Sequence, residues 1–222
     1  MNKCMIFDLD GTLLDSMWVW EKIDIDFLSK RGLEVTDEYI QEIKTHNFNS
    51  GSRYVIEKFG LRESQEEVIR EWKDMAAYHY AHDVKLKAGV REFLVQAKET
   101  GFKLAVATSS TRELFEPCLK RNGVHQLFDS FTETTEADRG KAFPDVYELA
   151  ASRCQAAVED CIVYEDIYTA VNGAKSGGFY TVGVHDDMSA AEEDAIRQIC
   201  DKYIYSFEGL SAGEFIMDVS RS

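Results

Sequence analysis

The sequence contains few prolines and no long apolar run. Two prolines in 222 residues, together with 45% hydrophobic and 12% aromatic residues, exclude a proline-rich or low-complexity scaffold and predict a packed core. Apolar residues nowhere continue over the roughly eighteen positions that a membrane-spanning helix needs. We therefore expect a globular protein without a membrane span.

Positive charge is also scarce. The chain has 25 Lys and Arg residues against 40 Asp and Glu residues, which leaves a formal net charge of −15. This charge repels phosphate backbones and anionic lipid headgroups, so we expect neither a nucleic-acid partner nor a membrane partner. If the substrate is an anion, positive charge must be concentrated locally at its binding site.

Cysteine is limited to five residues, an odd number without C-x-x-C or zinc-type spacing. Cys4 and Cys161 fall within apolar runs, which is typical of reduced, buried thiols. The N-terminal segment lacks the basic region, hydrophobic stretch and cleavage site of an export signal. We therefore expect a cytoplasmic protein, and we expect it to be a monomer.

Short apolar runs alternate with amphipathic segments along the chain. Runs that are apolar at nearly every position are typical of strands covered on both faces, as in a parallel sheet. They are Cys4–Phe7, Leu104–Ala107, Cys161–Tyr164 and Phe179–Val184, with weaker runs at Phe128–Phe131 and Tyr203–Phe207. Helical spacing predicts helices over Gly89–Thr100, Thr111–Asn122 and Phe143–Ser152, with capping-box pairs at Ser110/Glu113 and Ser189/Glu192. The sequence predicts an α/β fold with a Rossmann-like, doubly wound parallel sheet.

Residues 16–86 interrupt this alternation. They contain no convincing strand, about four helical segments and a capping-box pair at Ser64 and Glu67. Because a strand precedes them and the other strands follow, we predict an α/β core domain of residues 1–15 and 87–222 with an inserted helical cap domain of residues 16–86. Open α/β sheets bind ligands at the carboxyl ends of their strands, so this cap is expected to act as a lid.

Acidic residues follow two of the predicted strands. Asp8 and Asp10 follow the first, directly before Gly11, and Glu165 and Asp166 follow the strand that ends at Tyr164. Paired carboxylates beside a buried strand end favour a neutralising cation, and a set of oxygen ligands favours Mg²⁺. The alternatives are an Asp-Gly turn with solvated carboxylates and a helix-capping role for Asp166.

Two further segments favour an anion. Thr108, Ser109 and Ser110 end a predicted strand and open a helix, whose N-terminal N–H groups attract negative charge, although an ordinary N-cap is an equal alternative. Lys141 precedes a helix whose first turn could hold Pro144, and it either supplies charge for a phosphate or is solvated.

In order and spacing these segments resemble the four motifs of the haloacid dehalogenase superfamily of phosphotransferases. The matching positions are Asp8 to Thr12, Thr108, Lys141 with Pro144 and Asp145, and Glu165 with Asp166. The resemblance covers essentially the whole chain. The helical insertion is similar to the cap of the β-phosphoglucomutase-like branch.

The resemblance implies covalent catalysis. Asp8 would attack phosphorus and become an aspartyl phosphate, and Asp10 would protonate the leaving oxygen and later activate water. An acid at position 10 argues against dehalogenation, since a departing halide needs no proton. Mg²⁺ would be held by Asp8, the Asp10 carbonyl and Asp166, with Glu165 in support. The phosphoryl group would be held by Thr108 and Lys141, with backbone N–H groups of Leu9, Asp10 and Ser109.

The resemblance also bears on the substrate. Sugar-phosphate mutases of this branch carry a histidine twelve residues after the nucleophile, where this chain has Trp20. We therefore expect a Mg²⁺-dependent phosphatase of small phosphorylated metabolites, such as sugar phosphates. A phosphomutase and a catalytically silent phosphate-binding module are the alternatives. Candidate residues for contacts with the substrate are Trp18, Trp20, His46, Asn49, Arg53 and Lys73, although aromatic residues at such spacing also form cores and charged ones are often solvated.

Overall fold

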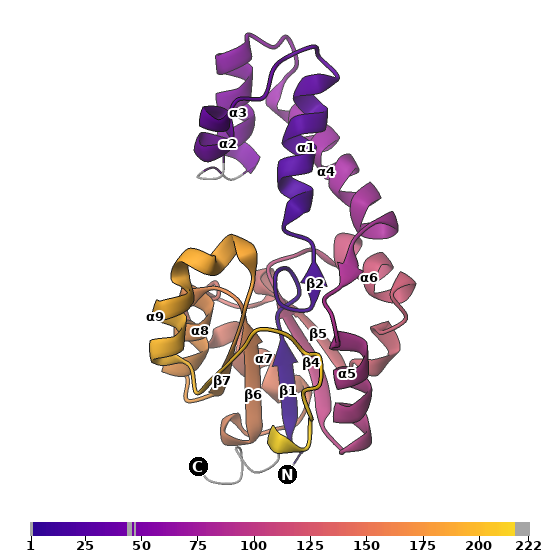
Figure 1. Ribbon diagram of the computed structural model, residues 1–222, viewed down its shortest axis with the longest axis vertical. Helices are drawn as coiled ribbons and strands as arrows, with labels where there is room; N and C mark the ends of the chain where they lie inside the picture. The colour runs from indigo at the N-terminus through magenta and orange to yellow at the C-terminus, as the bar shows by residue number, and fades with distance from the viewer. Residues whose placement is uncertain (1, 44–45, 47, 216–222) are drawn as a thin grey trace. The chain divides into compact units, whose positions relative to one another are not determined.

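The computed structural model describes residues 2–43, 46 and 48–215 (Figure 1). The chain divides into two compact units, each described here by itself. We call Met1–Ser16 with Val84–Ser222 the sheet unit and Met17–Asp83 the helical unit. No helix in the described ranges combines the length and apolar character needed to cross a membrane.

The sheet unit is built on a parallel sheet of six strands in the order β5-β4-β1-β6-β7-β8. The strands are β1 (Cys4–Phe7), β4 (Lys103–Thr108), β5 (Ser130–Glu133), β6 (Cys161–Glu165), β7 (Tyr180–Val184) and β8 (Lys202–Ile204). Each of the apolar runs in the sequence overlaps one of these strands, so the predicted parallel α/β fold is confirmed. All residues of β1 are fully buried, as expected for a central strand covered on both faces.

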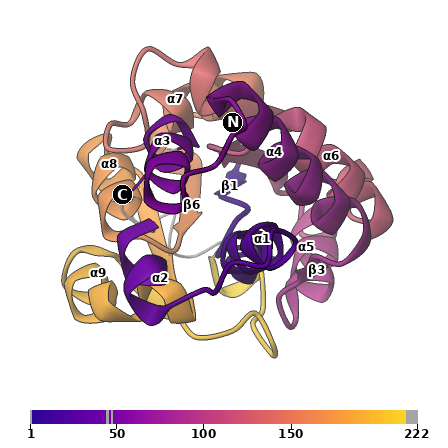
Figure 2. The same cartoon turned by 90° about the horizontal axis from the view of Figure 1, so that it is seen from above.

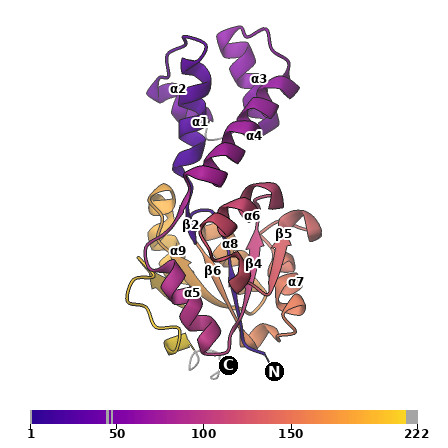
Figure 3. The same ribbon diagram turned by 90° about the vertical axis from the view of Figure 1, so that its right-hand side faces the viewer.

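Helices cover both faces of this sheet, and Figures 2 and 3 show α5 and α7 on opposite sides of it. The helices are α5 (Val90–Glu99), α6 (Arg112–Arg121), α7 (Asp145–Arg153), α8 (Tyr168–Ser176) and α9 (Glu193–Ile199). On the α7 face, Cys4 and Ile6 pack with Val146 and Ala150. On the α5 face, the Phe7 ring stacks on Tyr164 with centroids 4.6 Å apart. The alternating side chains of β1 therefore join the two halves of the core.

The strand register places three chain segments at one edge of the sheet. Phe7 of β1 lies opposite Val106 of β4 and Tyr164 of β6. Since all three strands are parallel, their carboxyl ends lead to neighbouring positions. The residues that follow Phe7, Val106 and Tyr164 therefore meet at the carboxyl edge.

A short antiparallel pair was not predicted from the sequence. β2 (Leu14–Asp15) pairs with β3 (Lys85–Leu86), and the Lys87 N–H donates to the Leu13 carbonyl at 2.9 Å. Strands of two residues are too short to show an alternating pattern. This pairing joins residues 84–86 to the sheet unit.

Two of the predicted capping boxes are wrong. The pair Ser110 and Glu113 does not cap α6, because that helix begins only after Thr111. The pair Ser189 and Glu192 does not cap a helix either, because both residues lie inside one short 3₁₀ helix. The spacing that defines a capping box also occurs where no helix begins.

The helical unit contains the expected helices: α1 (Trp18–Ser29), α2 (Asp37–Ile43), α3 (Phe48–Phe59) and α4 (Gln65–His82). The capping box of α4 is confirmed. The Glu67 N–H donates to the Ser64 hydroxyl at 3.3 Å, and the Ser64 N–H donates to Glu67 Oε2 at 2.8 Å. These two bonds satisfy backbone donors that the first turn of a helix leaves free.

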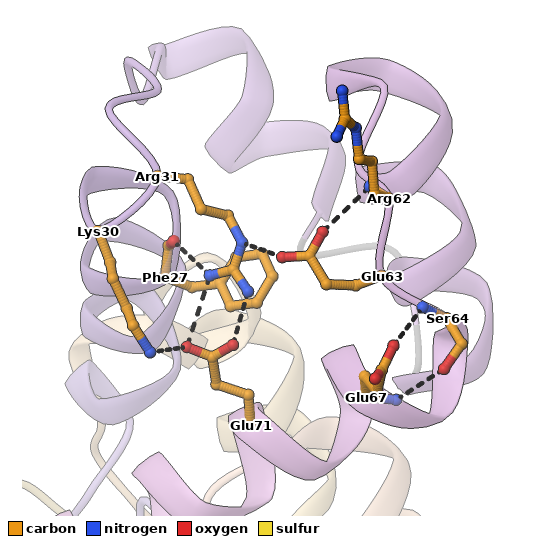
Figure 4. A network of polar contacts seen from close by, with 8 residues as sticks. All are labelled: Phe27, Lys30, Arg31, Arg62, Glu63, Ser64, Glu67 and Glu71. Atoms are coloured by element: carbon orange, nitrogen blue, oxygen red, sulfur yellow. Dashed lines mark hydrogen bonds and ion pairs between the residues drawn. The ribbon is translucent and has the colours of Figure 1, made fainter.

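An ion-pair network joins α1 to α4 in this unit (Figure 4). The Arg31 guanidinium lies 2.6 Å from Glu71 Oε2 and 2.9 Å from Glu63 Oε1, and it stacks 3.6 Å from the centroid of the Phe27 ring. Lys30 makes a second contact to Glu71 at 2.7 Å. Because the Arg31 side chain is largely buried, this network fixes its position better than a solvated pair would.

Candidate active site

The site begins where β1 ends. The Asp8 N–H donates to the Tyr164 carbonyl at 3.1 Å, which holds Asp8 in line with the strand. Its side chain is buried and contacts the Lys141 ammonium. The same ammonium lies 2.6 Å from Glu165 Oε1 at the end of β6. The structure therefore brings together three residues that are far apart in the sequence.

Asp166 completes an acidic cluster with Asp8 and Glu165. One carboxylate oxygen from each residue lies within 4.8 Å of the others, and all three residues are buried. The Thr12 hydroxyl donates to Asp166 Oδ1 at 3.3 Å. Glu165 Oε2 is buried without a hydrogen-bond partner in the part of the chain that the structure describes.

The electrostatics of the cluster follow from its burial. Burial favours the neutral form of Lys141, but the charges of Asp8 and Glu165 outweigh this effect and raise the pKa of Lys141. Burial raises the pKa of Glu165 to about 8 against the lowering effect of Lys141. Burial and the charge of Asp8 raise the pKa of Asp166 to about 7. Lys141 therefore stays protonated, and its single positive charge does not balance the negative charges of the carboxylates around it.

This donor set suits a hard divalent cation. Every candidate ligand atom in the cluster is a carboxylate oxygen, the type of atom that Mg²⁺ prefers. When all three carboxylates are ionised, they and the Lys141 ammonium carry a net charge of −2, which one divalent cation balances. Glu165 Oε2, buried and without a hydrogen-bond partner among the described residues, fits the role of a further oxygen ligand to such a cation.

The Asp10-Gly11 turn packs directly against Asp166. Gly11 has φ +84°, and a Cβ built on it would lie 2.3 Å from Asp166 Oδ2, so a larger residue does not fit. The Leu9 carbonyl accepts N–H bonds from Leu13 at 2.9 Å and Leu14 at 2.7 Å, which closes the turn. Asp10 Oδ1 accepts a bond from the Ser16 hydroxyl at 2.7 Å. The proposed metal bond of the Asp10 carbonyl and the phosphate contacts of the backbone stay predictions.

Thr108 is the last residue of β4, beside β1. It is fully buried, and its hydroxyl oxygen accepts the Ser110 N–H at 3.0 Å. Ser109 is exposed. Both residues are therefore at the carboxyl edge that holds Asp8, as the strand order requires.

The segment that carries Lys141 is held by close packing against α8. A Cβ on Gly173 would lie 2.0 Å from the Lys141 carbonyl oxygen. Pro144 is the N-cap residue of α7, one position before the helix rather than inside its first turn. The close approach of Gly173 on α8 and the start of α7 at Pro144 thus fix the backbone of Lys141.

Tyr147 is a site residue that sequence reasoning missed. Its hydroxyl donates to Glu165 Oε1 at 2.8 Å from the buried face of α7. The sequence pattern indicates only an apolar helix position at this point, because a tyrosine ring packs as other aromatic residues do. No local signal distinguishes its hydroxyl contact.

The helical unit holds the predicted specificity residues. Trp20 is partly buried, and its ring packs edge-on against Phe48 with centroids 5.7 Å apart. Arg53 is exposed on α3. Whether Trp20 and Arg53 contact a substrate stays a prediction.

Comparison with known proteins places the chain in a family. Residues 5–184 match the sequence model described as haloacid dehalogenase-like hydrolase. Validoxylamine A 7'-phosphate phosphatase from Streptomyces hygroscopicus subsp. limoneus is 28% identical over 202 residues, with 88% of this chain and 93% of the relative covered. A phosphorylated carbohydrates phosphatase from Thermotoga maritima is 26% identical over 202 residues, with 89% and 94% covered.

A solved structure supports the same fold. The crystal structure of a proposed beta-phosphoglucomutase from Thermotoga maritima superposes with a TM-score of 0.85 at 24% identity, covering 98% of this chain and 99% of the other. The sequence match includes the β1 end, the β4 end, Lys141 and the β6 end that form the site. The chain therefore belongs to the haloacid dehalogenase-like hydrolases.

Proposed function

We propose that the protein is a Mg²⁺-dependent phosphatase that hydrolyses phosphomonoesters of small metabolites through an aspartyl phosphate on Asp8. The observation that carries this proposal is the buried contact of Lys141 with Asp8 and Glu165 beside the carboxylate of Asp166. A phosphoryl group next to Asp8 would meet a fixed ammonium on a chain whose net charge is −15. The phosphatase names of the two relatives support the same reaction.

In the first step, an oxygen of the Asp8 carboxylate attacks phosphorus and the ester P–O bond breaks. Asp10 gives its proton to the departing oxygen, which leaves as an alcohol. Lys141 neutralises charge on the phosphoryl oxygens, and the Thr108 hydroxyl is a second candidate contact to them. Asp8 then carries the phosphoryl group as a mixed anhydride.

In the second step, water attacks the phosphorus of this anhydride while Asp10 takes up a water proton. The bond between Asp8 and phosphorus breaks, which releases phosphate and restores both carboxyl groups. Asp8, the Asp10 carbonyl and Asp166, supported by Glu165, would hold Mg²⁺. When bound, this ion neutralises the carboxylate cluster and withdraws charge from the phosphoryl oxygens.

The proposed substrate class is phosphorylated carbohydrate-like compounds. The Thermotoga maritima relative, of which 94% is covered, is named a phosphorylated carbohydrates phosphatase. We retain the prediction of a cap domain that selects the organic group, with Trp20 and Arg53 among its contacts, but assign it to the helical unit Met17–Asp83, since Ser16 and residues 84–86 of the predicted range 16–86 belong to the sheet unit. We also propose a cytoplasmic monomer that binds neither nucleic acid nor membrane.

The test is phosphate release from a panel of sugar phosphates, polyol phosphates, nucleotides and short-chain phosphoesters, with Mg²⁺ and with excess chelator. We expect Mg²⁺-dependent release from a few related phosphorylated carbohydrates. Isomerised sugar phosphate without free phosphate would show a mutase. A complete lack of conversion of any compound would contradict both enzymatic functions.

A further inference from the structure

Lys87 links three segments of the sheet unit. It directly follows β3, and its ammonium contacts the Gly11 carbonyl, the His185 carbonyl at 2.7 Å and Asp186 Oδ2 at 2.8 Å. The Lys87 side chain is 19% exposed and that of Asp186 is 10% exposed. An ammonium group has three N–H bonds, so these contacts use its full donor capacity.

The Gly11 end of this link belongs to the catalytic turn. Gly11 follows Asp10 and packs against the Asp166 carboxylate so closely that a Cβ would overlap it. The turn thus lies between Lys87, which holds the Gly11 carbonyl, and Asp166. A shift of Gly11 would move Asp10 or press on Asp166.

The other end of the link is also fixed. Asp186 Oδ1 accepts the Met188 N–H at 2.9 Å. His185, the residue before Asp186, directly follows β7, which is paired with β6 in the sheet. The backbone N–H of Lys87 donates to the Leu13 carbonyl at 2.9 Å. Lys87 therefore holds the catalytic turn both through its main chain and through a side chain that is anchored on the segment directly after β7.

We propose that Lys87, anchored by Asp186, is a positioning residue that keeps the Asp10-Gly11 turn in register with Asp166 for phosphoryl transfer. This inference rests on the proposed phosphatase activity. In the described residues, the Lys87 ammonium bonds to the Gly11 carbonyl, the His185 carbonyl and Asp186, and to none of the proposed reacting groups, although its positive charge acts to lower the pKa of Asp166. It acts by restricting the backbone that carries Asp10, and the fixed geometry of that backbone sets both the acid position and the metal site.

The experiment compares Lys87→Met with Asp186→Asn and with the control Lys175→Met. Lys175 forms a similar Lys–Asp pair with Asp201 near the start of β8, at the opposite end of the strands. Each protein is assayed for kcat and KM on the best substrate of the wild-type protein. Thermal unfolding is measured with and without Mg²⁺, so that metal binding has a readout independent of turnover.

Lys87→Met is expected to lower kcat about tenfold or more with little change in KM, because a displaced catalytic group affects the transition state more than substrate binding. It should also reduce the rise in melting temperature caused by Mg²⁺. Asp186→Asn leaves both carbonyl contacts possible and should cause a smaller loss of the same kind. Lys175→Met should match the wild-type protein in both readouts.

Wild-type kcat and an unchanged Mg²⁺ effect in a folded Lys87→Met protein would overturn the inference. If Lys87→Met does not fold, Asp186→Asn decides, and wild-type values for that variant would also overturn it. A wild-type protein without phosphatase activity would contradict the proposed function instead. These two failures are therefore distinguishable.

Discussion

Replacing Gly173 by alanine tests how the fold holds Lys141 in place. Gly173 lies on α8, and the atoms nearest to a Cβ added there belong to the backbone of Lys141 and Ala142. An added Cβ would lie 2.0 Å from the Lys141 carbonyl oxygen and 2.9 Å from the carbonyl carbon of Ala142. Both are backbone atoms, which cannot rotate away as a side chain can.

The size of the effect follows from this overlap. Ordinary contacts begin at 3.4 Å, so α8 and the Lys141 segment must separate by 3.4 − 2.0 = 1.4 Å. Misplacing a catalytic group by about 1 Å costs on the order of 100-fold in rate. Overpacking costs about 1–3 kcal/mol of stability, and the better helix propensity of alanine offsets at most about 1 kcal/mol of it. We therefore expect kcat to fall about 100-fold and stability to fall modestly.

Gly140→Ala is the matched control. Gly140 directly precedes Lys141, but a Cβ there meets no atom within 4 Å. Both variants are assayed for phosphate release at saturating substrate and for urea unfolding. Wild-type kcat in Gly173→Ala, or an equal loss in Gly140→Ala, would refute the argument that α8 positions Lys141.

Three further predictions concern other residues. Asp10→Asn should slow the first step, transfer of the phosphoryl group to the enzyme, about 100-fold or more with sugar phosphates and much less with 4-nitrophenyl phosphate, since an acidic alcohol leaves without a proton; equal losses in the first-turnover release of the alcohol would exclude Asp10 as the acid. Burial raises the pKa of Asp24 to about 6, although the Tyr39 hydroxyl that donates to its carboxylate acts in the opposite direction. The folded state therefore favours the protonated carboxyl group. The stability that this group contributes is present below about pH 4 and is lost as the pH rises through 6. Asp24→Asn should therefore raise the melting temperature at pH 7.5 but not at pH 4, and the reverse order would contradict the assigned shift. Ser64→Ala removes one bond of the α4 capping box and should cost about 1 kcal/mol in chemical unfolding, whereas no change would show that the box is unimportant.

The grouping of site residues at the carboxyl edge of the sheet could be predicted, because the sequence patterns that mark strand ends are local. The three central apolar runs are followed directly by an acid or a hydroxyl residue, and a parallel sheet brings such ends together whatever the length of the chain between them. Asp8, Thr108 and Glu165 could therefore be grouped once the strands were recognised. Lys141 was grouped with them only by family resemblance, because a lysine before a helix has no distinctive local pattern.

The contacts that hold the site could not be predicted in this way. Lys87 meets the Gly11 carbonyl 76 positions away and the His185 carbonyl 98 positions away, and neither partner has a side-chain signature for this contact. Gly173 fits against Lys141 only in the folded packing of α8. The sequence therefore indicates which groups react, whereas only the tertiary structure shows what positions them.

The most direct test of the account is to trap the phosphoryl group on the enzyme. Asp10→Asn is mixed with 4-nitrophenyl phosphate and Mg²⁺, quenched in acid, digested and analysed by mass spectrometry. The leaving group needs no proton but hydrolysis of the intermediate needs a base, so the account predicts that one phosphoryl group accumulates on Asp8. Labelling of a different residue, or undiminished turnover by Asp8→Asn, would contradict it.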